Sequence, residues 1–395
     1  MMVMSGAGTS YIYNLYTQQI KDNLGYDEAG MSKIAYYRAL GTWMAVFNGF
    51  IVELIPAWFG LFLAATMNFG GYFMTWLAVT RRIPSPKVWQ MCIYLAVATN
   101  SPNFSGTIAI VNSVHNFPMN RGVTIEKLPQ VLIVPADYSS IQQKEYCFAN
   151  IFINKPERGE DHTILQAILS ADMFYIFLIT VCGYGSALTF FEQLRPFGLA
   201  LQYHERLIQS IITLTTIWNY YGRVYAGFVS ELLLTKWKLS RSIMMSIILL
   251  LQCSGLLLVA FPNIPGMYYV ASVILGFTFG AQVSVNLSMI SELFGLKHYA
   301  TFLNFAQAST PMWLYLMNTR LTKVLYAREA AKDIPPGIDP STLKDLTCTG
   351  HHCFMVSFSI LAAIAFIGAL VSLQFARKTR EFYQGDIYKK FRLAT

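Results

Sequence analysis

Charged residues are scarce in this chain of 395 residues. Asp, Glu, Lys and Arg together make up 13% of it, about half of the roughly 25% that is typical of soluble domains. Apolar residues make up 54%, and the mean hydropathy is +0.42. This composition disfavours a soluble globular domain and indicates a membrane protein.

The chain also lacks the short motifs of common catalytic sites. It has no nucleophile elbow, phosphate-binding loop or zinc-protease motif, so we expect no enzyme activity, no cofactor and no resident metal. The net charge is +8, but nothing resembles a nucleic-acid-binding module, and we expect no nucleic-acid partner. The first residues, MMVMSGAGTSYIYNLY, carry no basic segment and do not predict a signal peptide.

Ten apolar blocks account for the hydropathy. Most are close to the roughly 20 residues that a membrane-spanning helix needs. Glycines recur inside them, and small residues let membrane helices approach closely. The glycines are Gly70, Gly71, Gly183, Gly185, Gly276 and Gly280, and the blocks are 1–16, 37–55, 58–79, 88–114, 164–191, 207–228, 243–261, 267–290, 299–317 and 354–375.

The side of the membrane on which each loop lies can be predicted from the basic residues. An even number of spans places both termini on one side, together with the basic loop 236–241 and the basic C-terminal tail. Basic loops are enriched on the cytoplasmic side, so we expect both termini in the cytoplasm. The basic loop 80–87 falls on the opposite side and departs from this rule.

Several stretches then carry a resemblance to a known family. They are NLGYDEAGMS, MNFGGYFMTWLAVTRRIPSPKVWQMCIY, NFPMNRG, WNYYGRVYAGFVSE, YYVASVILGFTFGAQ, SMISELFGLKHYATFLN and REFYQGDIYKKFR. Together they resemble the plant nodulin-like branch of the major facilitator superfamily, which includes the nuclear-fusion-defective proteins. The resemblance covers most of the chain outside residues 122–163.

The resemblance implies an all-α fold of twelve helices in two six-helix bundles. This chain departs from it, because the first block begins as if cut within a helix and because the charged, proline-containing segment 122–163 stands where helices five and six are expected. We therefore expect a polytopic α-helical membrane protein with a major-facilitator-like two-bundle fold, truncated to about ten transmembrane helices. The expected parts are an incomplete N-terminal bundle (1–121), a cytoplasmic linker (122–163), a C-terminal six-helix bundle (164–376) and a cytoplasmic tail (377–395).

The stretch GRVYAGFVSELLLTKWKLSR at 222–241 resembles the loop motif that follows the second helix of a facilitator bundle. Arg223, Gly227 and Glu231 lie four residues apart and therefore on one helix face. We expect Glu231 to accept bonds from the N-terminus of a neighbouring helix, and Lys236, Lys238 and Arg241 to face anionic lipid headgroups. An ordinary helix end with charges that reach the interface is the alternative.

The first half of the chain has a partial counterpart of this motif in GFIVELIPAWFG. It keeps Gly49 and Glu53 but lacks the basic residues. We therefore expect any contact of this kind in the first half to be weaker.

Facilitator cavities are lined by helices one, four, seven and ten, so polar residues there are candidates for solute contact. Helix four has a polar stretch around Pro102, and a proline frees a backbone carbonyl that is tolerated at membrane depth where it lines a cavity or is buried in protein. Hydrogen bonding between helices is the alternative role for these side chains. The candidates are Tyr13, Asn14, Asn100, Ser101, Asn103, Tyr184, Gln282 and Asn286.

Few charges fall inside the predicted spans. Asp172 comes early in the seventh helix and is the candidate proton site, and Arg223 comes late in the eighth. A lone charge at mid-bilayer costs at least about 2.5–3.5 kcal/mol. We therefore expect each to lie near an interface or to have a partner.

Cys348 and Cys353 flank the sequence TGHH in the last long loop. The loop faces away from the cytoplasm in the predicted topology, where disulfides persist. The resemblance also favours a disulfide between them, since the family shares the cysteines but not the histidines. Free thiols, or a metal site that includes His351 and His352, are the alternatives.

Two functions remain open. The first is secondary transport of a small polar or anionic organic solute by alternating access. The second is a transport-inactive short form with a regulatory or structural role, which would act beside a full-length homologue. In both, the partners are membrane lipid and the location is the plasma membrane, the vacuolar membrane or another endomembrane.

Overall fold

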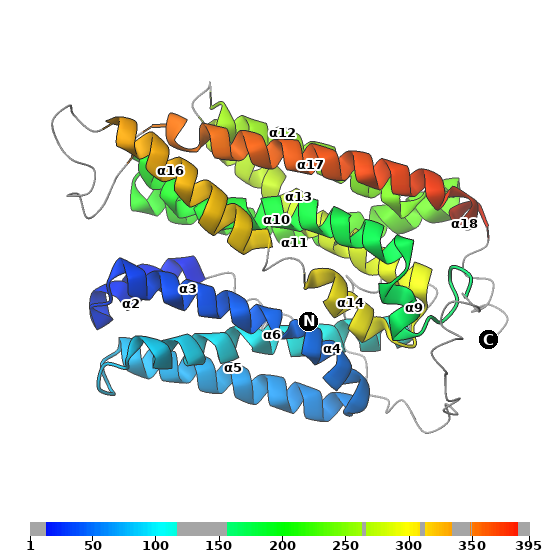
Figure 1. Cartoon of the computed structure of the whole chain (residues 1–395), viewed down its shortest axis with the longest axis horizontal. Helices are drawn as coiled ribbons and strands as arrows, with labels where there is room; N and C mark the ends of the chain where they lie inside the picture. The colour runs from blue at the N-terminus through cyan, green and yellow to red at the C-terminus, as the bar shows by residue number, and fades with distance from the viewer. Residues whose placement is uncertain are drawn as a thin grey trace. The chain divides into compact units, whose positions relative to one another are not determined.

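The computed structural model describes residues 13–116, 156–262, 266–308, 313–333, 348 and 350–385. The part of the linker predicted at 122–163 that precedes residue 156, and the tail beyond residue 385, lie outside the described residues. Within the described ranges the regular structure is helical, with no strand. Figure 1 shows the helices, which include both long rods and short segments. Contacts between Cα atoms divide the chain into two compact units, which are treated separately below.

Unit 1 comprises residues 1–176, 287–308 and 385–395. Within it, α5 and α3 both pack against α6, and the short α14 packs against α4 (Figure 1). The apolar core between the first helices includes Ile20, Ile34 and Leu95. The helices are α2 (Tyr13–Leu24), α3 (Glu28–Trp43), α4 (Ala45–Leu54), α5 (Ala57–Val79), α6 (Val88–Asn116), α9 (Ile164–Ile168) and α14 (Tyr299–Gln307).

The loop between α5 and α6 is tied back to the end of α2. Arg81 adopts a left-handed backbone conformation, with φ of 56°, and its guanidinium donates to the carbonyl of Asn23 at 3.1 and 3.2 Å. The hydroxyl of Tyr26 donates to the carbonyl of Pro86 at 2.6 Å. Burial raises the pKa of Tyr26 above its usual value, so the hydroxyl keeps its proton and its bond at neutral pH.

Unit 2 comprises residues 177–286 and 309–384. Its helices α12 and α17 lie side by side (Figure 1). One segment, η3, is wound as a π-helix, a rare form that is frequent at functional sites. The elements are α10 (Ala171–Ala200), α11 (Glu205–Trp237), α12 (Arg241–Ala260), α13 (Met267–Phe294), η3 (Tyr315–Thr322), α16 (Lys323–Ala330), η4 (Ala331–Asp333), α17 (His352–Lys378) and α18 (Arg380–Gln384). The first residues of α10 and the last of α13 belong to unit 1.

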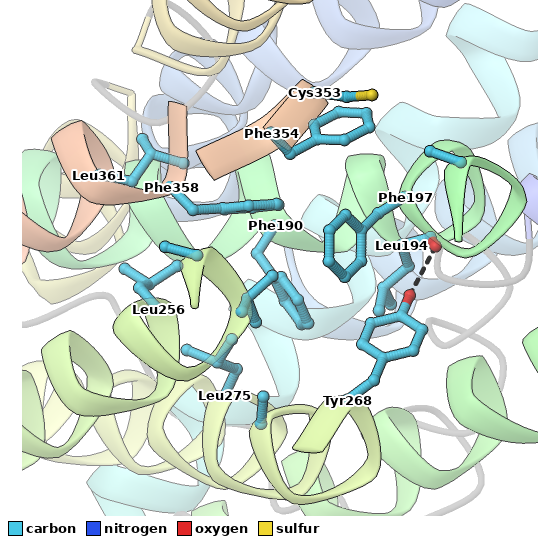
Figure 2. Close-up of a cluster of buried hydrophobic side chains, with 14 of the residues drawn as sticks. Phe190, Leu194, Phe197, Leu256, Tyr268, Leu275, Cys353, Phe354, Phe358 and Leu361 are labelled. Atoms are coloured by element: carbon cyan, nitrogen blue, oxygen red, sulfur yellow. Dashed lines mark hydrogen bonds between the residues drawn. The ribbon is translucent and has the colours of Figure 1, made fainter. Parts of the chain in front are cut away.

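The core of unit 2 is rich in aromatic side chains. Figure 2 shows Phe190, Phe197, Phe354 and Phe358 gathered from α10 and α17. Phe197 meets both Phe354 and Phe358 edge to face, with ring centres 5.5 Å apart, the arrangement that aromatic quadrupoles prefer. The hydroxyl of Tyr268 donates to a carbonyl of α10 at 2.6 Å, which satisfies the one polar atom of this side chain.

Glycines set the close approach of several helices. A Cβ atom on Gly276 or Gly280 in α13 would collide with backbone carbonyls of α11, and one on Gly71 in α5 would lie 2.7 Å from the backbone of α6. Gly183 and Gly185 are equally crowded by side chains. The predicted role in packing is therefore confirmed for these five glycines. It is wrong for Gly70, which has no heavy atom within 4 Å of the position where a Cβ atom would lie.

Four of the described helices are long and apolar enough to cross a membrane by length and composition, namely α10, α12, α13 and α17. The predicted block 164–191 is divided in the structure, because α9 ends at Ile168 and α10 begins at Ala171. The hydroxyl of Ser170 accepts from the amide of Met173 and so caps the new helix. The helix that begins at Glu28 starts nine residues before the block predicted at 37–55, because its first turns are polar and hydropathy does not reveal them.

Candidate transport site and helix-end contacts

The motif at the end of α11 forms a buried ion pair. Arg241, the first residue of α12, donates from Nη2 to Oε2 of Glu231 at 2.6 Å and from Nη1 to the hydroxyl of Ser230 at 2.5 Å. The side chains of Arg241 and Glu231 are 0% and 8% exposed. Lys238 ends α11 in a left-handed conformation, and Ser240 caps α12, so a tight turn brings the two charges together.

The prediction that Arg241 faces lipid headgroups is therefore wrong, because its guanidinium is buried against Glu231. Lys236 and Lys238, which were predicted to share that role, are exposed. The acceptor role of Glu231 toward the backbone of a neighbouring helix stays a prediction.

We expected Glu231 to accept bonds from the N-terminus of a neighbouring helix, and the structure shows such a contact at Glu53. Its Oε1 accepts from the amide and the hydroxyl of Thr301 at 3.1 and 2.6 Å, and its Oε2 lies 2.8 Å from Nδ1 of His298. Thr301 is the third residue of α14, and His298 immediately precedes this helix. Glu53 therefore caps the N-terminus of α14, where unsatisfied amides and the helix dipole favour a negative charge.

Gly49 makes this contact sterically feasible. A Cβ atom at Gly49 would lie 2.9 Å from both the carbonyl oxygen of Ala300 and the Cα atom of Thr301. Glycine and glutamate thus act together, since the first lets α4 approach α14 and the second supplies the cap.

The predicted polar stretch of α6 is partly buried within unit 1. Asn100 accepts from the side-chain amide of Asn48 at 2.9 Å, and both side chains are buried, as is Ser101. Asn103 is half-buried. Pro102 lies within α6 without ending it. Asn48 was not predicted, although it is an amide in the apolar block 37–55 and could have been found on that ground.

Unit 2 contains a second polar network, which joins three helices. Gln252 of α12 donates to the carbonyl of Gly183 at 3.0 Å and to the hydroxyl of Ser186 at 2.7 Å, and it accepts from Gln282 of α13. The hydroxyl of Tyr184 donates to the carbonyl of Gln282 at 3.4 Å. The structure therefore brings together Tyr184 and Gln282, two of the separately predicted candidates. Gln252, which links Gln282 to α10, was missed.

Asn286 lies one turn beyond Gln282 in the same helix. Its amide nitrogen donates to the hydroxyl of Thr180 at 3.1 Å, whereas its buried Oδ1 has no hydrogen-bond partner among the described residues. Buried polar atoms are rarely left unpaired without a reason. Among the predicted solute contacts in the described part of the chain, Asn286 thus has an acceptor atom, Oδ1, that is available to a solute.

Arg223 lies near the middle of α11, not late in its helix as predicted, because the helix extends to Trp237 and is 33 residues long. Its Nε donates to Oδ1 of Asn219 at 3.1 Å, and its side chain is half-buried. We expected Arg223 to lie near an interface or to have a partner, and this bond supplies a partner. An ionisable residue within a membrane-spanning helix is a functional candidate, but α11 is not among the four described helices that are apolar enough to span.

Asp172 lies in the first turn of α10 and is ion-paired. Nε and Nη2 of Arg158 donate to its two carboxylate oxygens at 2.6 and 3.1 Å, which is the two-bond geometry of a strong arginine–carboxylate pair. The pair gives Asp172 a structural role at this helix end. Its use as a proton site stays a prediction. Tyr13 and Asn14 open α2, but their side chains lie outside the described residues.

Cys348 and Cys353 are joined by a disulfide just before and within the start of α17. Both are buried in the aromatic core of unit 2 (Figure 2 labels Cys353). His352 lies beside them, with its Nε2 3.7 Å from the sulfur of Cys348.

Comparisons with known protein families agree with the helical pattern. A nodulin-like family model matches residues 1–129, and the model of the NFD4 C-terminal domain matches residues 169–385, more than half of the chain. The chain belongs to the nodulin-like, NFD4-type family. Residues 130–168 lie outside both matches.

Among curated proteins, the nodulin-like chain is similar to the protein NUCLEAR FUSION DEFECTIVE 4 of Arabidopsis thaliana, with 26% identity over 125 residues. The alignment covers 31% of this chain and 21% of that protein. The chain thus matches about a fifth of the length of this relative.

Among solved structures, the nodulin-like chain is similar to a bacterial homologue of the iron transporter ferroportin in its outward-facing state. The TM-score is 0.53 at 11% identity, over 95% of this chain and 97% of that chain. The E. coli fucose:proton symporter gives a TM-score of 0.49 at 9% identity, which is too low to support an argument. The predicted class, a polytopic α-helical membrane protein with a major-facilitator-like fold, is confirmed.

Proposed function

We propose that the nodulin-like chain is a secondary transporter of a small anionic organic solute and not an enzyme. The fold similarity to a transporter supports this proposal. The observation that carries it is the position of Arg223 near the middle of α11. If α11 crosses the membrane in this proposal, a cation near its middle is costly to bury, and binding an anion offsets that cost.

The immediate surroundings of Arg223 fit this role. Nε of Arg223 donates to Asn219, and the exposed Tyr220 precedes Arg223 by three residues, a spacing that makes the two side chains neighbours on the helix surface. Tyrosine hydroxyls donate to anions, and the guanidinium fork matches a carboxylate. In this proposal the amides of Gln282 and Asn286 add polar contacts to the same solute.

The proposal is tested by solute uptake into vesicles that contain the purified protein. We expect uptake of one or more labelled carboxylates, and a loss of at least about tenfold in Arg223→Gln. The matched control is Arg206→Gln, which makes the same change in the exposed first turn of the same helix and should leave uptake unchanged. Uptake that is equal in wild type and Arg223→Gln would contradict the assignment of Arg223.

A transport-inactive short form is the second candidate, with a full-length homologue as its partner. The observation in its favour is that residues 130–168 belong to neither family match. This segment overlaps the predicted linker that replaces two helices. The test is uptake by this chain and by a variant in which helices five and six of a homologue replace the linker. Uptake by the restored variant alone favours the short form, and uptake by both favours the transporter.

A further inference from the structure

The loop that leads into α17 brings together three potential metal ligands. The Sγ atoms of Cys348 and Cys353 and a ring nitrogen of His352 all lie within 4.8 Å of one another. The two sulfurs are bonded to each other, so in this state neither can bind a metal. Thiolates and imidazole are the ligands that zinc prefers in proteins.

The loop is held in place by contacts other than the disulfide. The backbone amide of Cys348 donates to the hydroxyl of Tyr326 at 3.0 Å, and this bond connects the loop to α16. The amide of Gly350 donates to the carbonyl of Ala200 at 2.8 Å, which ties it to the end of α10. His352 and Cys353 belong to the first turn of α17. We expect these two hydrogen bonds to hold the three ligands close together when the bond between the sulfurs is broken.

Gly350 also positions the histidine. It has a φ of 114°, in the region that favours glycine, and a Cβ atom at this position would lie 3.1 Å from Nδ1 of His352. The imidazole therefore sits against a backbone segment that has no side chain, and its Nε2 points to the sulfur of Cys348.

Charge balance suits a metal in this environment. Cys348 and Cys353 lie among apolar side chains, including Phe354 and Phe358, where two separate thiolates would be costly to bury. A divalent cation between two thiolates makes a neutral centre and removes that cost. The partly exposed imidazole of His352 leaves the third ligand near solvent, which gives the ion a path to the site.

We propose that this loop is a redox-controlled metal site, closed as a disulfide and able to bind a zinc-like divalent cation through Cys348, His352 and Cys353 when reduced. A dithiol reductant breaks the sulfur–sulfur bond by exchange, passes two electrons and two protons to the two sulfur atoms, and leaves as its own disulfide. Metal binding then displaces the two thiol protons and forms two metal–sulfur bonds and one metal–nitrogen bond.

The probe is Co²⁺, which replaces zinc and reports thiolate ligands by a charge-transfer absorption band. The full chain in detergent is reduced with a dithiol, freed of the reductant without oxygen, and titrated with Co²⁺. We expect the band in the reduced protein and no band in the oxidised protein, which is its folded control. In His352→Ala the dissociation constant for Co²⁺ should rise at least about tenfold, because even residues outside the first coordination shell cost about 10–100-fold.

Two further variants separate this site from other sources of signal. His351→Ala is the matched control, because His351 is the exposed neighbour and lies outside the ligand group; it should bind as wild type does. The chain has four other cysteines, so the double variant Cys348→Ser, Cys353→Ser should lose the band. No band in the reduced wild type, a band that survives in the double variant, or equal affinity in His352→Ala and wild type would each overturn the proposal.

Discussion

The same five-residue pattern, Gly-Phe-x-x-Glu, occurs once in each unit, at 49–53 and at 227–231, and its two glutamates have different partners. In unit 1, Glu53 caps the N-terminus of α14, a helix that follows it by some 250 residues in the chain. In unit 2, Glu231 pairs with Arg241, which lies ten residues further along the chain. One local pattern thus supports both a long-range and a short-range contact.

The residues that follow each pattern explain the difference. After Glu231 the chain makes a tight turn and presents Arg241 at the start of the next helix. After Glu53 comes the apolar sequence LIPAWFG, which offers no cation. Oxygen atoms of Glu53 are therefore available to the amide and hydroxyl of Thr301. Where an arginine follows closely in the chain, as Arg241 does, it pairs with the glutamate. Where none follows, as after Glu53, the glutamate binds the N-terminus of a helix that is distant in the chain.

Replacing Arg241 by alanine should have the largest effect on stability. It leaves the buried carboxylate of Glu231 without its guanidinium, and breaking one side of a buried pair costs about 3–5 kcal/mol. Thermal unfolding of the purified protein in detergent measures this change. The control is Arg195→Ala, because Arg195 pairs with the partly exposed Glu205 at 3.2 Å, and such pairs contribute at most about 1 kcal/mol. Equal losses in the two variants would contradict a buried role for Arg241.

Gly49→Ala should have the next largest effect. The added methyl group would lie 2.9 Å from backbone atoms of Ala300 and Thr301, so α4 and α14 must separate, and overpacking of this kind costs about 1–3 kcal/mol. Gly70→Ala is the matched control, since no heavy atom lies within 4 Å of its Cβ position. It should be neutral or slightly stabilising, because alanine favours a helix more than glycine does. A loss in Gly70→Ala as large as in Gly49→Ala would show that the contact with α14 is unimportant.

The sequence predicts the helical membrane class well because apolar blocks of spanning length leave few alternatives. It also singles out both glutamates of the repeated pattern, Glu53 and Glu231. It predicts their partners poorly, because the bond of Glu53 to Thr301 depends on how distant helices pack, and periodicity carries no information about that. The same reason explains why Gln252 was missed, since one amide in an apolar run does not reveal that Gly183 and Gln282 lie beside it.

The position of Arg223 shows a different limit. Hydropathy ended the eighth span near residue 228, and this placed the arginine late in the helix. The polar end of α11, with Glu231 and Lys236, continues the helix beyond the apolar block to Trp237. The helix end is set by the left-handed Lys238 and the cap at Ser240, which are features of a turn and not of hydropathy.

Removing the carboxylate of Glu53 should reduce stability least of the three changes, and it tests one contact, the bond from Glu53 to Thr301. Glu53→Ala deletes a helix cap, at a cost of about 0.5–2 kcal/mol, whereas Glu53→Gln keeps an oxygen that can accept from Thr301 and loses only the charge. We therefore expect Glu53→Gln to retain part of the stability that Glu53→Ala loses, as measured by thermal unfolding. Combining Glu53→Ala with Thr301→Val should then cost less than the sum of the single changes, because both remove the same bond. Strict additivity would mean that Glu53 and Thr301 act independently and that the contrast between the two glutamates does not hold.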